Sequence, residues 1–142
     1  MIFATEKPKV IFYEKTGCAG NQRQKKVLTS HGIAFEVRSL LDTKWDTKTL
    51  GIFFDNLTNI QMVNDSAPKI KNHEIDIDVL SKDELISLMC TDPILIKRPL
   101  LEIGNEKICG FDIEKINQIL NSNIAKNLEI PTCLSDDKCK TV

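Results

Sequence analysis

The sequence lacks a long hydrophobic run and an excess of charge of one sign. Its apolar runs are short, Pro93-Ile94-Leu95-Ile96 being typical, whereas a helix that crosses a bilayer needs roughly 20 apolar residues. We therefore expect no contact with a membrane. Lys and Arg number 19 and Asp and Glu 20, for a formal charge of -1. Because broad nucleic-acid binding needs a basic excess, we expect no nucleic-acid partner.

The N-terminus lacks the apolar core of a secretory signal peptide, so we expect a cytoplasmic protein. A disulfide framework is lacking as well. The five cysteines are odd in number and unevenly spaced, unlike those of a small secreted scaffold. A cysteine in the cytoplasm is reactive only where its surroundings favour the thiolate.

The 142 residues suit one domain, and the apolar pattern that is present predicts a mixed α/β fold. Residues 9–14 are β-branched and aromatic and predict a buried strand. Residues 20–30 predict a helix that stops at His31-Gly32, and residues 33–41 predict a second strand. Because the connections are short, we expect a right-handed parallel unit.

The middle of the chain predicts helices. Asp46 is placed as an N-cap, and Ser81 with Glu84 forms a capping-box pattern. The polar, turn-rich residues 64–78 lie between them. The elements expected afterwards are strands at 100–103 and 107–109 and a helix at 113–120, capped by Asp112.

This order, β-α-β, helical insert, β-β-α, is that of the thioredoxin-like fold. We predict a single α/β domain of this fold over residues 1–120. Residues 121–142 turn polar and irregular and predict a loosely held C-terminal tail.

Cys18 stands where the first predicted strand gives way to the first helix, in "YEKTGCAGNQRQKK". A thiol there meets free backbone N–H groups and the positive end of the helix dipole, and both favour the thiolate. Arg23 on the same helix adds positive charge. The position of Cys18 alone is equally compatible with a small apolar residue in a loop. Asn21 replaces the second cysteine of a C-x-x-C pair, so a disulfide at Cys18 needs a thiol from a distant part of the chain or from outside, such as glutathione.

Arg98-Pro99 is the second candidate feature. A proline that opens a strand can be cis and can lie beside a nucleophile in this fold. Arg98 would then offer a planar guanidinium to an oxyanion or to the thiolate. A surface arginine before an edge-strand proline is the alternative, and the dipeptide alone favours it.

The other cysteines carry weaker signals. Cys90, on a predicted helix, is expected to pack in the core, and Cys109, in a short strand, has no preferred face. Cys133 and Cys139 lie in the tail, where a flexible thiol could resolve a disulfide of Cys18; an idle polar tail is the alternative.

Histidine is scarce, with His31 and His73 the only two. A tetrahedral zinc site would need ligands from distant segments, so no metal site is expected. His31 is interpreted as part of the helix stop.

Taken together, "YEKTGC" before a polar helix and the later "DPILIKRPLLEIGNEKICGF" resemble the glutaredoxin-type arsenate reductase family, which includes the Spx regulators. The resemblance covers roughly residues 9–120, and "LMCTDPILIKRPLL" is its most specific piece. Within the family the sequence is most similar to the nitrogenase-associated branch. The segments that carry this closer similarity are Val10 to Lys25, Ser66 to Lys71 and Arg98 to Asp112.

The resemblance implies Cys18 as the nucleophile and Arg98 as the oxyanion-binding arginine before a cis Pro99. In the arsenate reductases the thiolate attacks arsenate, and glutathione with glutaredoxin regenerates it. No bound cofactor is implied. The expected partners are glutathione as co-substrate, glutaredoxin, or a protein related to nitrogenase.

The sequence departs from the family pattern where arsenate would bind. Active reductases use a triad of arginines, but "QMVNDSAPK" contains none and holds Asp65, which would repel an oxyanion. Gly110 stands where the reductases place another arginine. Since charge-assisted bonds contribute about 1.5–3 kcal/mol each, losing two should slow oxyanion turnover by orders of magnitude.

Spx regulators carry a C-x-x-C switch, which Asn21 removes here. We therefore expect a nitrogenase-associated monothiol redox or accessory protein, a thiol-dependent oxidoreductase if it is an enzyme. The alternatives are a non-catalytic adaptor or Spx-like regulator, and a glutathione-dependent arsenate reductase.

Overall fold

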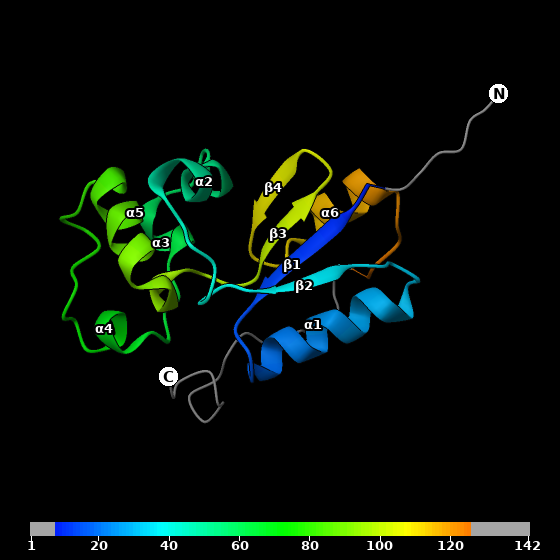
Figure 1. The fold of residues 1–142 in the computed structure, drawn as a ribbon, viewed down its shortest axis with the longest axis horizontal. Coiled ribbons are helices and arrows are strands. Elements are labelled where there is room, and N and C mark those ends of the chain that lie inside the picture. Colours follow the sequence, from blue (N-terminus) through cyan, green and yellow to red (C-terminus); the bar gives the residue numbers. More distant parts are fainter. Residues whose placement is uncertain (1–7, 126–142) are drawn as a thin grey trace.

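The computed structural model describes residues 8–125, which form a four-stranded mixed sheet with helices packed against it (Figure 1). The strand order is β2-β1-β3-β4. β1 (Val10–Glu14) pairs in parallel with β2 (Glu36–Ser39) and antiparallel with β3 (Leu100–Ile103), which pairs antiparallel with β4 (Glu106–Cys109). The predicted parallel opening unit and the final hairpin are confirmed.

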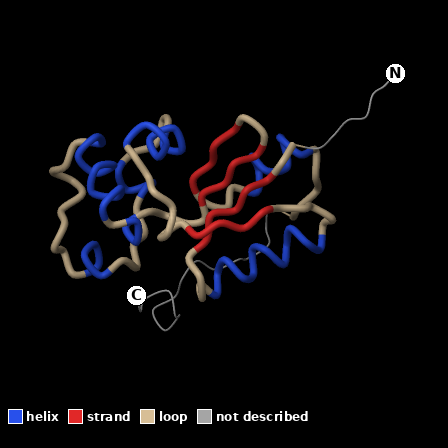
Figure 2. The backbone as a smooth tube through the Cα atoms, viewed as in Figure 1, coloured by secondary structure: helices blue, strands red, loops and turns tan. Residues whose placement is uncertain are grey.

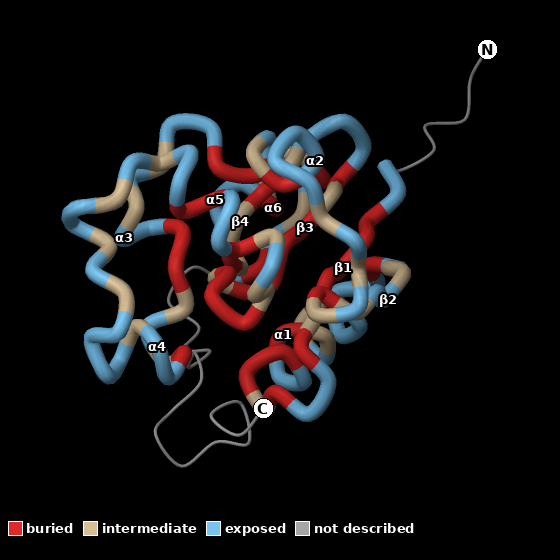
Figure 3. Tube along the Cα trace, turned by 60° about the vertical axis from the view of Figure 1, so that its left-hand side comes forward, coloured by how far each residue is buried: buried red, intermediate tan, exposed pale blue. Residues whose placement is uncertain are grey.

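Side chains of β1 alternate between two hydrophobic clusters, as the period of a strand requires. Val10 and Phe12 pack in a cluster with Leu28 of α1 (Ala19–Ser30) and Ile116 of α6 (Ile113–Leu120). Tyr13 points to the opposite cluster, which is formed with the helical insert. The central strands are therefore buried on both faces (red in Figure 3).

The helical insert lies beside the end of the sheet where β1 ends and β3 begins (Figures 1 and 2). Its predicted N-caps are present: the Asp46 carboxylate accepts from the amides of Lys48 and Thr49, and Ser81 and Glu84 form a capping box. The insert consists of α2 (Thr47–Gly51), η1 (Ile52–Phe54), α3 (Asn59–Met62), α4 (Pro68–Lys71), α5 (Lys82–Thr91) and η2 (Pro93–Leu95). Within residues 8–125, no helix has the length and apolar character to span a membrane.

The second strand is shorter than predicted. The expected strand over 33–41 was wrong at its start, because the backbone of Gly32 and Ile33 closes the end of α1: their amides donate to the carbonyls of Thr29 and Leu28. Pairing with β1 begins only at Glu36.

Packing continues past α6. Ile124 is buried, its amide donates to Oδ1 of Asn117 at 2.9 Å, and Nδ2 of Asn117 donates to the Ile124 carbonyl at 2.8 Å. Residues 121–125 are thus held against the domain. The rest of the predicted tail, including Cys133 and Cys139, lies outside the described residues.

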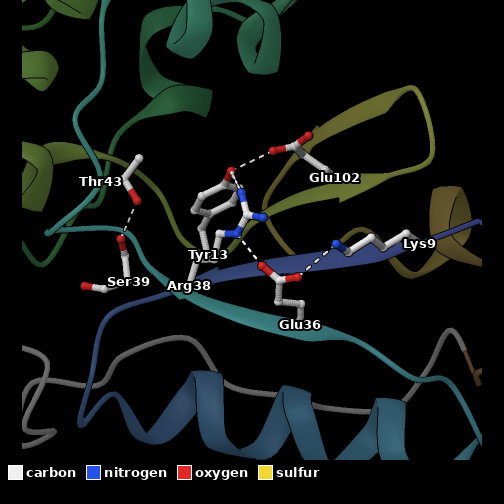
Figure 4. Close-up of polar contacts among 7 residues, drawn as sticks. All are labelled: Lys9, Tyr13, Glu36, Arg38, Ser39, Thr43 and Glu102. Carbon is white, nitrogen blue, oxygen red and sulfur yellow. Dashed lines mark hydrogen bonds and ion pairs between the residues drawn. The ribbon is translucent and has the colours of Figure 1, made fainter.

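A chain of polar contacts links β2, β1 and β3 (Figure 4). Glu36 pairs with Lys9 at 2.9 Å and with Arg38, whose guanidinium donates to the Tyr13 hydroxyl at 3.5 Å. Tyr13 in turn donates to Glu102 at 2.7 Å. Burial, followed by this hydrogen bond, raises the pKa of Tyr13. Exposed ion pairs contribute little stability by themselves. This series of polar contacts therefore mainly specifies the register of the three strands.

Candidate thiol site

Cys18 is the N-cap of α1. A turn at Gly17, which has the left-handed φ of 86°, ends β1, and the Cys18 amide donates to the Lys15 carbonyl at 3.0 Å. The Cys18 sulfur accepts from the amide of Asn21 at 3.5 Å. The thiol thus takes the place of the Ser or Asp oxygen of an ordinary N-cap, where negative charge is favoured.

Asn21, which stands where a second cysteine would be, clamps the Cys18 loop to its helix. Its Oδ1 accepts from the Lys15 amide at 3.0 Å, and its Nδ2 donates to Oε1 of Gln24 at 2.9 Å. Asn21 and Gln24 are both buried. An Asn at this position therefore has a structural role that a cysteine could not perform, because a thiol offers no comparable pair of donor and acceptor.

Arg98 and Cys18 line the same cavity, of about 130 Å³. The Arg98-Pro99 peptide is cis, and Arg98 is buried. The lining comes from three places: the start of α1, the segment from α3 to α4, and the residues before β3. Its members are Cys18, Gly20, Asn21, Gln24, Ile60, Val63, Asn64, Asp65, Ser66, Lys97 and Arg98.

Only some of the predicted site residues line the cavity that contains Cys18. Asn21 and Arg98 line the cavity with Cys18, and Pro99 follows directly as a buried residue. Arg23 is exposed, and the cavity lining does not include it. Cys133 and Cys139 lie outside the described residues, so their role as resolving thiols stays a prediction.

Two lysines of the site were not predicted from the sequence. Lys15 has only 5% of its surface exposed. Burial lowers the pKa of its ammonium, Arg98 lowers it further, and Cys18 raises it. The charged end of Lys15 therefore lies near both Arg98 and Cys18. A lysine directly after a strand is usually solvated, so the sequence holds no signal for this burial.

Lys97 is the second missed lysine, and it covers Gly110. The Gly110 backbone has a φ of 88°, and a Cβ added there would lie 3.3 Å from Cε and 3.9 Å from Nζ of Lys97. The lysine side chain therefore occupies the space next to position 110. The cavity lining contains two cationic residues, Lys97 and Arg98, and the acidic residue Asp65.

Cys90 and Cys109 are the other described cysteines. Burial raises the pKa of the Cys109 thiol to about 12, against smaller opposing effects of Lys97 and Lys115. Burial, with a contribution from Asp46, also raises the pKa of Cys90. Both thiols are therefore poor nucleophiles near neutral pH. Among residues 8–125, no group of three or more His, Cys, Asp or Glu side chains is placed to hold a metal ion.

Comparison with known proteins relates this chain to one family. The model described as "ArsC family" matches residues 13–119. An uncharacterized 15.7 kDa protein from the draG 3' region of Rhodospirillum rubrum is 35% identical over 126 residues, which span 89% of this chain and 88% of that protein. The global transcriptional regulator Spx 2 of Bacillus cereus is 23% identical over 124 residues, covering 85% of this chain and 94% of the regulator.

Solved structures of this type share the fold. The arsenate reductase from Vibrio cholerae superposes with a TM-score of 0.67 at 24% identity, covering 81% of this chain and 100% of the reductase. The thioredoxin-like fold predicted from the sequence is confirmed.

Replacing Asn21 by Ala should destabilise the protein. The buried backbone amide of Lys15 and the side-chain oxygen Oε1 of Gln24 would each lose a partner, at about 1–3 kcal/mol per group. The free energy of unfolding from equilibrium urea denaturation measures the loss. Gln22→Ala, at an exposed position of the same helix turn, is the matched control; equal stability of the two variants would show that the clamp contributes nothing.

Iodoacetamide should modify Cys18 well before Cys109 in the folded protein. With a pKa of about 12, Cys109 would be thiolate in only about one molecule in 10⁴ at a pH about four units lower. Mass spectrometry of a variant carrying Cys133→Ser and Cys139→Ser follows each site. In urea the two thiols should react alike; similar rates in the native state would contradict this ordering.

Proposed function

This chain belongs to the ArsC family, and from that membership we propose that it is a monothiol redox protein whose nucleophile is Cys18. One observation carries the proposal: the N-cap sulfur of α1 and the guanidinium before the cis proline line a single cavity. A thiolate at a helix N-terminus beside cationic side chains is the arrangement that activates cysteines for nucleophilic attack.

The proposed reaction is thiol–disulfide exchange with glutathione. The Cys18 thiolate attacks one sulfur of glutathione disulfide; the new bond from Sγ forms, the old S–S bond breaks, and one glutathione leaves as thiolate. A second thiol, of glutathione or of glutaredoxin, then attacks the glutathione sulfur of the mixed disulfide; a new disulfide with that glutathione forms, the bond to Sγ breaks, and Cys18 leaves as its thiolate. No second cysteine is needed at position 21, where Asn21 serves as the clamp.

Arsenate reduction is a weaker proposal for this chain. The lining places the Asp65 carboxylate in the cavity with Lys97 and Arg98. A carboxylate opposes binding of an oxyanion that carries more than one negative charge. Turnover of arsenate well below that of an efficient reductase is expected.

The cellular setting is proposed from similarity. The nitrogenase-associated branch resembles this sequence at both halves of the site, and the relative from the draG 3' region of Rhodospirillum rubrum supports the same setting. We infer a cytoplasmic accessory role in nitrogen fixation, with a nitrogenase-related protein as the partner of the mixed disulfide.

A non-catalytic adaptor is the second candidate. It is favoured by the small exposed fraction of Cys18, 2%, which leaves the cavity as the route to the thiol. The similarity to the Spx 2 regulator adds to this alternative.

Treatment with glutathione disulfide should place one glutathione on the protein when Cys18 is its sole cysteine, and none on Cys18→Ser. Glutathione with glutaredoxin should remove it, as intact-protein mass spectrometry would show. In a coupled assay, arsenate should be reduced at least about 100-fold more slowly than by an active family reductase.

Absence of the mixed disulfide in a folded protein would reject the redox proposal in favour of the adaptor. Arsenate turnover equal to that of the reductase, and lost in Cys18→Ser, would show instead that arsenate is a substrate.

A further inference from the structure

We propose that the outer edge of β2 is a pairing surface for a second copy of this chain. The two β2 strands align antiparallel about a two-fold axis at Val37, so that the sheets of both copies form one continuous sheet. No residue of β2 lines the cavity that contains Cys18. The pairing is therefore independent of the proposed thiol chemistry.

The backbone of β2 presents an edge to a second strand. Among residues 8–125, β2 is the terminal strand of the sheet and pairs on one side only, with β1. The Leu40 amide donates to the Glu14 carbonyl of β1 at 2.7 Å. Because the backbone groups of successive residues in a strand point to opposite edges, those of Arg38 also face β1, and those of Val37 face outward. Outward peptide groups along an edge are a template for pairing with another chain.

The charged side chains of β2 are complementary to those of a second, antiparallel copy. Glu36 and Arg38 lie opposite Ile11 and Tyr13 of β1, so both belong to the same face of the sheet. A pairing centred on Val37 places each Glu36 opposite Arg38 of the partner subunit, and opposite charges in this position stabilise a sheet. A parallel pairing in register would instead oppose like charges. The charge pattern therefore favours the closed two-fold arrangement that most dimers adopt.

Both charged side chains are already oriented within one copy (Figure 4). Glu36 contacts Lys9 at 2.9 Å and also the guanidinium of Arg38, which donates to the Tyr13 hydroxyl at 3.5 Å. The side chains of Arg38 and Glu36 still expose 45% and 40% of their surface. Because a guanidinium has several donors and a carboxylate several acceptor sites, each can add a contact across the axis. Their prior orientation lowers the entropic cost of that contact.

The opposite face of the pair is apolar at the axis. Val37 lies opposite Phe12, on the face that packs against α1, yet 43% of its surface is exposed. At the axis it would pack against Val37 of the partner subunit, and side-chain pairs across neighbouring strands are the unit of sheet stabilisation. Lysine and proline commonly protect edge strands from pairing. Neither occurs in the Glu-Val-Arg-Ser sequence of β2.

The pairing is expected to be weak. The paired segment is short, because the outward carbonyl of Ser39 already accepts from the Thr43 hydroxyl at 2.6 Å. Small interfaces of this kind are typical of transient complexes, so we expect a Kd on the order of 100 µM. Sedimentation equilibrium of the full chain, from about 10 µM to about 1 mM, covers both sides of that value. A phosphine reductant in the buffer keeps disulfides from linking the copies.

Charge reversals test the register of the pairing. Glu36→Arg and Arg38→Glu should each weaken the dimer at least about tenfold, because like charges then face each other across the axis. An equimolar mixture of the two variants should dimerise again, since one strand then carries two positive charges and the other two negative ones. The double variant should also dimerise, with the charges exchanged. Glu106→Arg, at an exposed position on β4 at the other edge of the sheet, is the matched control and should behave as wild type.

The outcomes decide the proposal in both directions. A wild-type chain that stays monomeric at about 1 mM would overturn it and leave the β2 edge to a strand of another protein. A dimer that neither single reversal weakens would also overturn it, because the contact would then lie elsewhere. Loss in both single variants with recovery in their mixture would support it, and that recovery would verify that both variants are folded.

Discussion

The site depends on the antiparallel pairing of β1 with β3, with Tyr13 opposite Leu100. In an antiparallel pair the end of one strand lies beside the start of the other, so Cys18 after β1 and Arg98 before β3 meet although they are far apart in the sequence. The register is defined by burial on both faces: a slip by one residue would turn Phe12 away from its cluster and Tyr13 into it. The hydrogen bonds of Tyr13 with Arg38 and Glu102 support the same register.

The proposed reactivity of Cys18 depends on the groups that this geometry places around its sulfur. The helix N-terminus favours negative charge at Cys18, Arg98 and Lys15 bring positive charge to it, and Asn21 holds the loop in place. Asp65, Lys97 and Arg98 line the same cavity. The Asp65 carboxylate in this lining disfavours a multiply charged anion.

Local signals in the sequence predicted much of the fold. Asp46, Ser81 and Asp112 are N-caps where expected, and α6 has its predicted bounds, because side-chain caps act over three or four residues. Features that depend on distant packing were not predictable. Lys15 is buried although it directly follows β1, and the Lys97 side chain lies against Gly110, which is distant in the sequence. Arg23, expected to assist from the sequence alone, points to solvent, since its position on α1 lies off the buried face.

The most direct test of the account is the rate at which iodoacetamide, an uncharged reagent, alkylates Cys18 at neutral pH when Arg98 is replaced by Met. Because the guanidinium lies in the same cavity as the thiol, the rate should fall by about tenfold, the effect of roughly 1.4 kcal/mol of thiolate stabilisation. Arg23→Met, on the same helix as Cys18 but outside the cavity, should leave the rate unchanged. An undiminished rate in Arg98→Met, or an equal loss in both variants, would contradict the claim that these two distant segments form one thiol site.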